Sequence, residues 1–102
     1  MRKEVMVKGY WVSAYREIID QKKLTAYAEA GGPAVIANGG RFLVRGGRVI
    51  PKDAGMAERT VIVEFDSLDA AIAAYESEAY QAALEKLDGG VIRDFRIVEG
   101  AD

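Results

Sequence analysis

Apolar and polar positions alternate along four stretches of the chain and recur at helical spacing along three others. Alternation is typical of a strand that buries one face, and a period near 3.6 is typical of a helix with an apolar stripe. The alternating stretches predict strands at Val5–Tyr15, Arg41–Arg45, Arg59–Phe65 and Val91–Glu99. The helical stretches predict helices from Asp20 to Asn38, over Leu68–Glu76 and over Glu78–Leu87.

Capping residues place the helix ends. Asp20, Ser67 and Ser77 each stand just before a helical stretch, and short polar side chains there accept hydrogen bonds from the first free N–H groups. Gly31-Gly32-Pro33 interrupts the first pattern, so we expect a kinked or two-piece helix that ends at Asn38-Gly39-Gly40. The segment 48–58 carries proline, glycine and several charges, and we expect it to form a mobile loop.

The order of these elements predicts the fold class. Strand, helix, strand, strand, two short helices and a last strand form an α+β, ferredoxin-like βαββαβ arrangement. Its four-stranded antiparallel sheet has the strand order 4-1-3-2, with the helices on one face. A chain of 102 residues has room for one domain, 1–102, with a modest core that association could extend.

The alternation also sorts the strand residues into two faces. We expect the more continuously apolar face to pack on the helices, and it collects Tyr10, Val12, Ala14, Phe42, Val44, Val61, Val63, Phe65, Phe95 and Ile97. The opposite face collects Trp11, Ser13, Tyr15, Arg41, Leu43, Arg45, Thr60, Ile62, Glu64, Arg96 and Val98. Because this second face mixes large apolar residues with charges, it predicts a sheet-on-sheet homodimer through Trp11, Arg41, Leu43 and Ile62. The alternative is an ordinary exposed face with scattered apolar residues.

Composition removes several functions. Fourteen basic and sixteen acidic residues leave a net charge of −2, which gives no electrostatic reason to bind nucleic acid or an anionic membrane. The chain has no cysteine and no histidine, which excludes thiolate chemistry and removes the usual zinc and haem ligands. Since no acidic metal-binding loop stands out either, we expect neither a metal nor a cofactor. Without a signal-like or membrane-spanning apolar stretch, the sequence predicts a cytoplasmic protein.

The βαββαβ order also occurs in RNA-recognition domains, whose third strand carries aromatic residues that stack on bases. Here Thr60 and Ile62 stand at those positions, and the net charge is negative. RNA binding is therefore not expected.

The run Gly39-Gly40-Arg41-Phe42-Leu43-Val44-Arg45-Gly46-Gly47, with Lys8-Gly9-Tyr10-Trp11-Val12 before it, resembles a bacterial family of about 100 residues known only as a domain of unknown function. The match continues through Val63-Glu64-Phe65, Ser67-Leu68 and Tyr75-x-Ser77-x-x-Tyr80-Gln81. The family looks like part of the dimeric α/β-barrel superfamily, in which two ferredoxin-like sheets pack face to face. Superfamily relatives include cofactor-free monooxygenases, isomerases, haem-dependent dismutases and proteins with no known reaction.

Two functions from different classes follow from the residues and the resemblance together. The first is a homodimeric protein that binds a small organic molecule in a pocket between sheet and helices. The alternative is a cofactor-free monooxygenase- or isomerase-like enzyme in which carboxylates and phenols carry the acid–base chemistry. Whether the protein is an enzyme stays open. Without histidine, the chemistry of a haem relative is not expected to carry over.

The candidate pocket residues are Tyr10, Arg45, Glu64, Tyr75 and Tyr80. An apolar cavity with a few phenols suits a small aromatic or acyl ligand, and Arg45 next to Gly46-Gly47 suits a carboxylate group; ordinary core packing and an interface ion pair are the alternatives. Glu64 stands directly across from Arg41 in the expected register, and the arginine would lower the pKa of the carboxyl group. This favours an ion pair that fixes dimer register over a general base.

Overall fold

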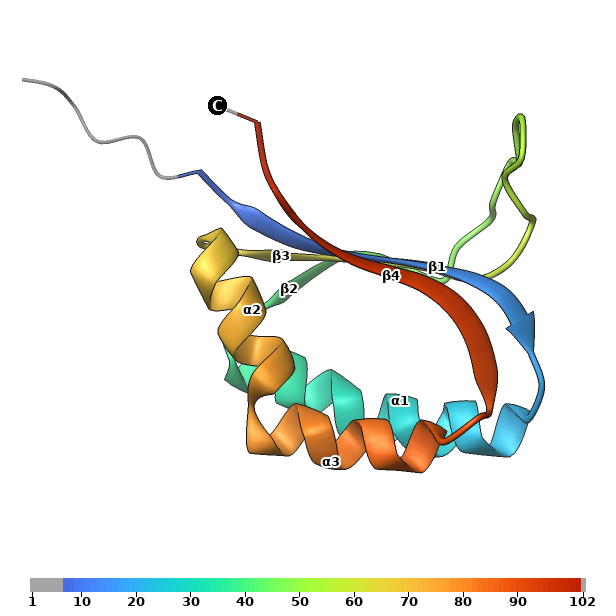
Figure 1. The fold of residues 1–102 in the computed structure, drawn as a ribbon, viewed down its shortest axis with the longest axis horizontal. Coiled ribbons are helices and arrows are strands. Elements are labelled where there is room, and N and C mark those ends of the chain that lie inside the picture. The colour runs from blue at the N-terminus through green and yellow to red at the C-terminus, as the bar shows by residue number, and fades with distance from the viewer. Residues whose placement is uncertain (1–6, 102) are drawn as a thin grey trace, which may run out of the picture.

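The computed structural model describes residues 7–101, and it shows a curved four-stranded sheet with three helices against one face (Figure 1). The strands are β1 (Gly9–Ile18), β2 (Arg41–Arg45), β3 (Thr60–Phe65) and β4 (Val91–Glu99). The helices are α1 (Gln21–Ala37), α2 (Leu68–Glu76) and α3 (Glu78–Leu87). The segment between β2 and β3 rises from the sheet on the side away from the helices (Figure 1).

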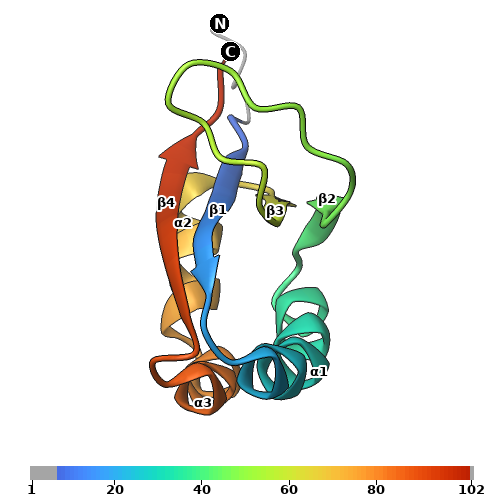
Figure 2. The same ribbon diagram turned by 90° about the vertical axis from the view of Figure 1, so that its right-hand side faces the viewer.

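The sheet is antiparallel, in the order β2-β3-β1-β4 (Figure 2). This confirms the predicted 4-1-3-2 order and the ferredoxin-like α+β class. The first strand differs most from its predicted bounds, because β1 begins at Gly9 and continues past a register shift between Tyr15 and Glu17. Val5 and Met6, the start of the predicted strand, lie outside the described residues.

The predicted caps are in place. Asp20 accepts hydrogen bonds from the backbone N–H groups of Lys22 and Lys23, and Ser67 accepts one from Ala70. The Ser77 hydroxyl closes α2 by donating to the Ala74 carbonyl oxygen at 2.8 Å, and it opens α3 by accepting from the Tyr80 N–H. These three side chains fix where the helices begin because each satisfies N–H groups that have no partner inside the helix.

Helix α1 runs unbroken from Gln21 to Ala37 with Pro33 inside it, so the two-piece alternative is wrong. It lies beside α3 under the sheet (Figure 2), and tertiary packing of this kind overrides the local preference of Gly31 and Gly32 against helix. Both glycines are buried. A Cβ atom on Gly32 would lie 2.6 Å from an Arg45 guanidinium nitrogen, so the missing side chain makes room for that arginine.

The expected orientation of β1 is wrong. Trp11, Ser13 and Tyr15 point into the helix layer and are 2–3% exposed, whereas Tyr10 lies on the open face. The Trp11 indole N–H donates to the Ala71 carbonyl oxygen of α2 at 2.8 Å, so Trp11 is a core residue and no part of an open dimer face. Gly9, which shares the parity of Trp11, packs against the backbone of Ser67 and Leu68. Only a glycine there lets α2 approach, and this fixes which face of β1 is covered.

A bulge in β2 corrects a second face assignment. The register with β3 shifts between Phe42 and Val44, so Val44 pairs with Ile62 on the open face and Arg45 turns toward the helices. The predictions had these two residues of β2 the other way round. Leu43, at the bulge, is 54% exposed, and Arg41 and Ile62 lie on the open face as predicted.

Aromatic rings fill the core between β1, β4 and the paired helices α2 and α3. The Trp11 ring is 4.6 Å from Tyr80, 5.1 Å from Phe65 and 5.4 Å from Phe95, measured between centroids. Tyr75 closes this cluster, with its ring 5.3 Å from those of Tyr80 and Phe95. The cluster ends at Arg93 on β4, where the interior becomes polar.

Candidate functional site

A cavity of about 40 Å³ lies between the sheet and α1. The polar residues that line it are Ser13, Tyr15 and Tyr27 and three arginines, Arg45, Arg59 and Arg93. The rest of its wall is alanine, glycine or a larger apolar residue such as Trp11 and Val61. Within residues 7–101, no aspartate, glutamate, asparagine or glutamine lines it. The cavity is therefore apolar with a strongly basic polar side.

Arg93 is the central polar residue of this site. It stands on β4 two residues before Phe95, on the face that the helices cover. Its guanidinium nitrogens lie 3.3 Å from the hydroxyl oxygens of Tyr27 and Tyr80, and 3.4 Å from those of Ser13 and Tyr15. Every one of these partners is a neutral hydroxyl. The guanidinium carbon also lies 4.7 Å from the Phe95 ring centroid.

None of the three arginines forms an ion pair within residues 7–101, where the ion pairs belong to Lys8, Arg41 and Arg96. A charge withdrawn from water is normally paired with an opposite charge. Burial acts to lower the pKa of Arg93, but the nearby phenols of Tyr27 and Tyr80 outweigh it and raise that pKa above its ordinary value. Arg93 is therefore a cation at neutral pH, and within residues 7–101 its charge contacts only neutral hydroxyls and aromatic rings.

The hydroxyls of Tyr27 and Tyr80 lie 2.6 Å apart and join α1 to α3 above Arg93. Tyr80 is fully buried, and burial raises the pKa of its hydroxyl well above its ordinary value, so the group stays protonated. Among the described residues, the only acceptor for the Tyr80 proton is the Tyr27 oxygen. Either hydroxyl can be the donor of this pair. Because Tyr80 is fully buried whereas Tyr27 lines the cavity, donation from Tyr80 to Tyr27 is the arrangement that leaves no buried proton without an acceptor.

Arg45 and Arg59 stand where the cavity meets an outer groove. The groove has a volume of about 350 Å³ and runs along α1 past Leu24, Thr25 and Glu29. Both arginines line the groove and the cavity alike. The Arg45 guanidinium lies 4.1 Å from the Phe42 ring centroid, and the Arg59 Nε atom is buried without a hydrogen-bond partner among the described residues. An unpaired buried donor of this kind is uncommon in native proteins.

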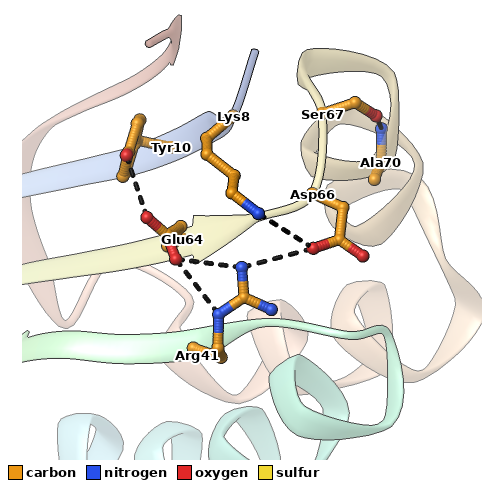
Figure 3. A network of polar contacts seen from close by, with 7 residues as sticks. All are labelled: Lys8, Tyr10, Arg41, Glu64, Asp66, Ser67 and Ala70. Carbon is orange, nitrogen blue, oxygen red and sulfur yellow. Dashed lines mark hydrogen bonds and ion pairs between the residues drawn. The ribbon is translucent and has the colours of Figure 1, made fainter. Parts of the chain in front are cut away.

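The open face of the sheet carries a separate polar network (Figure 3). The Arg41 guanidinium donates to Glu64 Oε1 at 2.9 Å and to Asp66 at 3.3 Å, and the Tyr10 hydroxyl donates to Glu64 Oε2 at 2.9 Å. Lys8 lies 3.5 Å from Asp66. The hydrogen bond from Arg41, followed by that from Tyr10, lowers the pKa of Glu64. The structure thus confirms that Arg41 and Glu64 stand directly opposite each other.

The predicted pocket residues separate into four places. Arg45 lines the cavity, Tyr80 lies behind the cavity wall, and Tyr75 packs in the aromatic core. Tyr10 and Glu64 contact each other on the open face, so neither reaches the cavity. The expectation that Tyr10 points toward the helices is wrong, because it followed from the reversed orientation of β1.

Sequence reasoning missed Tyr15, Tyr27, Arg59 and above all Arg93. The signal for Arg93 was present in the alternation, since Arg93 shares its parity with Phe95 and Ile97. A charged residue on a strand face that is otherwise apolar and covered by helices is the pattern that marks it.

Two further features bear on function. In the described part of the chain, no three acidic, histidine or cysteine side chains gather as a metal site would require. No helix within residues 7–101 has the length and apolar character to cross a membrane.

Solved structures with the same fold cover nearly the whole chain. A protein of unknown function from Rhodopseudomonas palustris is 17% identical, with a TM-score of 0.69 over 93% of this chain and 82% of the other. A dimeric ferredoxin-like protein of unknown function from Thermobifida fusca is 17% identical, with a TM-score of 0.58 over 95% and 92%. A candidate antibiotic biosynthesis monooxygenase from Caulobacter crescentus is 13% identical, with a TM-score of 0.58 over 95% and 92%.

At these identities the likeness shows the fold alone. No curated protein matches the chain. A family model does match, over residues 8–101, which is nearly all of the chain. The chain belongs to the family described as a domain of unknown function, DUF1330.

Proposed function

We propose that the protein is a homodimer that binds a small organic molecule in the cavity between its sheet and α1. The observation that carries the proposal is the convergence of Arg45, Arg59 and Arg93 on one cavity without an acidic partner within residues 7–101. Like charges placed together at a half-buried site cost free energy unless another interaction offsets that cost. A ligand that accepts hydrogen bonds from these arginines would supply such an interaction.

The size of the site restricts the ligand. A volume of about 40 Å³ is room for a few water molecules, since one water needs roughly 10–15 Å³ by this measure. The outer groove, at about 350 Å³, falls in the usual range for ligand sites. We therefore place a small polar head group in the cavity, and the rest of the molecule passes between Arg45 and Arg59 into the groove.

The homodimer is proposed through the open face of the sheet. Val44, Val98 and Ile92 are 37–48% exposed on that face, and two pairs of charges on it are formed within the chain, Arg41 with Glu64 and Arg96 with Asp94. Paired charges among apolar side chains suit a surface that a second sheet covers. The dimeric neighbour from Thermobifida fusca, which shares the fold, supports self-association.

A cofactor-free monooxygenase or isomerase is the second candidate. The cavity could stabilise a developing negative charge, because Arg93 and the phenol of Tyr27 are fixed donors in an apolar setting. The same site offers no carboxylate base within residues 7–101, and Glu64 lies on the other face of the sheet. NMR of a ligand incubated with the protein distinguishes the two functions. A binding protein leaves the ligand chemically unchanged, whereas an enzyme converts it to a product.

Trp11 gives a direct test of binding. It is the single tryptophan of the chain, it is 2% exposed and it lines the cavity, so a ligand there should change its fluorescence. We expect members of a library of small neutral and charged organic molecules to change the Trp11 emission and raise the melting temperature together, as linkage requires. The proposal would be contradicted if no compound of the library, at millimolar concentration, changed both the Trp11 emission and the melting temperature.

Two alanine variants provide the matched control. Ala28→Leu places a larger side chain where cavity and groove meet, and Ala82→Leu adds the same bulk to an exposed position of α3. We expect Ala28→Leu to abolish the ligand response and Ala82→Leu to retain it. If the two variants respond to the ligand equally, the ligand does not bind where the cavity and the groove meet.

A further inference from the structure

We propose that the ligand of this cavity is a monocarboxylate, whose carboxylate oxygens contact Arg93 and the hydroxyl of Tyr27. The inference rests on the proposed function and adds the chemical class of the ligand to it.

The charge of the cavity is the first step. Three arginines line it, and the residues around it between positions 7 and 101 contribute no acidic side chain. Glu29 lines only the outer groove, and it lies more than 4 Å from the guanidinium nitrogens of Arg45 and Arg59. An anion is therefore the group that the site lacks. In an apolar setting a charge pair with hydrogen bonds is stronger than in water, so an anionic ligand gains most here.

The direction of the hydrogen bonds is the second step. Ser13, Tyr15 and Tyr27 each accept from Arg93, so the proton of each hydroxyl remains available. Donation from the fully buried Tyr80 hydroxyl to Tyr27, 2.6 Å away, would leave the Tyr27 proton free in the same way. Arg59 adds a buried Nε–H without an acceptor among the described residues. The groups facing the cavity are thus donors, and a ligand must bring the acceptors.

The shape and the apolar walls distinguish a carboxylate from other anions. A guanidinium presents a planar fork that matches a carboxylate in two parallel hydrogen bonds. The cavity of about 40 Å³ is small, and Trp11, Val61 and Phe95 offer apolar contact beside the arginine. A carboxylate with a short apolar group uses both features, whereas inorganic phosphate would leave the apolar wall without a partner.

The test compares carboxylates with the amides of the same shape. Acetate, propionate, isobutyrate and benzoate are titrated against acetamide, propionamide, isobutyramide and benzamide, with Trp11 fluorescence and calorimetry as the readouts. We expect each carboxylate that fits to bind about 10- to 100-fold more tightly than its amide, as for a hydrogen bond that gains a charge. Inorganic phosphate is the competing anion, and we expect it to bind more weakly than the best carboxylate.

The outcomes separate this inference from the proposed function. If amides bind as well as carboxylates, the small-molecule function stands and the carboxylate class is wrong. If neither series nor any member of the wider library binds, the proposed function fails. If phosphate binds most tightly, the site prefers anions but does not select carboxylates. That result also overturns the inference.

Variants assign the contact to Arg93. Arg93→Gln should weaken carboxylate binding at least 10-fold and leave amide binding nearly unchanged, while Arg48→Gln, in the exposed segment between β2 and β3, should change neither. Arg93→Lys keeps the charge without the fork, and we expect an intermediate loss. If Arg93→Gln does not fold, Tyr27→Phe removes the proposed second donor and should still weaken carboxylates several-fold. Full carboxylate affinity in folded Arg93→Gln, or failing that in Tyr27→Phe, would overturn the assignment.

Discussion

The hydroxyl oxygens of Tyr27 and Tyr80 lie 2.6 Å apart, with Tyr27 on α1 and Tyr80 on α3. Both accept a hydrogen bond from the guanidinium of Arg93 on β4. Two helices and a strand thus meet at one polar point inside an otherwise apolar layer. The hydrogen bonds made here determine which hydroxyl proton points into the cavity. Loss of one of these oxygens should therefore lower the stability of the packing between α1 and α3.

Tyr80→Phe removes the fully buried hydroxyl of this pair. We expect it to lower the free energy of unfolding by about 1–2 kcal/mol, because it removes two hydrogen bonds, one with Tyr27 and one from Arg93, each with a usual net value of about 1 kcal/mol. Tyr75→Phe is the matched control, because within residues 7–101 the Tyr75 hydroxyl makes no hydrogen bond, and it should change stability by less than about 0.5 kcal/mol. Urea denaturation measures both. Equal effects of the two substitutions would show that the oxygen pair contributes nothing.

The raised pKa of Tyr80 predicts how stability depends on alkaline pH. Burial raises the pKa of its hydroxyl above the ordinary value of 10.0, so the folded state holds this proton at a pH where the unfolded chain releases it. The contribution is present in full below pH 10 and is lost as the pH rises above it. Urea midpoints between pH 9 and pH 11 should therefore fall, and they should fall less steeply for Tyr80→Phe. A variant that falls as steeply as the parent protein would contradict this.

The carboxyl group of Glu64 predicts the opposite behaviour in acid. Arg41 and Tyr10 lower its pKa from the ordinary value of 4.5, so its contribution is present above that pH and is lost as the pH falls below it. Arg41→Met should bring the Glu64 pKa back toward 4.5, which a carboxyl carbon NMR titration measures. Arg48→Met provides the control for the loss of one positive charge. An unchanged Glu64 pKa in Arg41→Met would mean that the ion pair does not form in solution.

The proposed dimer predicts that charge on the open sheet face blocks association. Ile62 lies in the middle of that face, on β3 between β1 and β2, and Ile62→Lys should give a monomer in sedimentation velocity at micromolar concentration. Ile36→Lys places the same charge on the exposed side of α1, where Ile36 is 63% exposed, and it should remain a dimer. A parent protein that is monomeric, or a dimer that survives Ile62→Lys, would move the interface or remove it.

Local signals predicted the elements well because they act within a few residues. Asp20, Ser67 and Ser77 cap their helices as expected, and Arg41 faces Glu64 across the β2–β3 pair. Which face of each strand the helices cover was harder to predict. Both parities of β1 carry aromatic residues, and the contact that decides between them joins Gly9 to α2, far along the chain. Alternation also assumes an unbroken register, which the bulge in β2 violates.

The candidate site was predicted least completely for the same reason. Its basic residues come from β2, from the segment before β3 and from β4, and only the fold brings Arg45, Arg59 and Arg93 together. Arg45 could be chosen from sequence because of the neighbouring glycines. Arg93 could be found only once the face of β4 that the helices cover was known.

A crystal structure with 3-bromopropionate tests the central claim most directly, because bromine gives an anomalous signal that water and buffer ions do not. We expect one bromine peak in the cavity or at its mouth between Arg45 and Arg59, with carboxylate oxygens about 2.7–2.9 Å from the Arg93 guanidinium nitrogens. Bromine only at the surface, or a carboxylate held without contact to Arg93, would contradict the account.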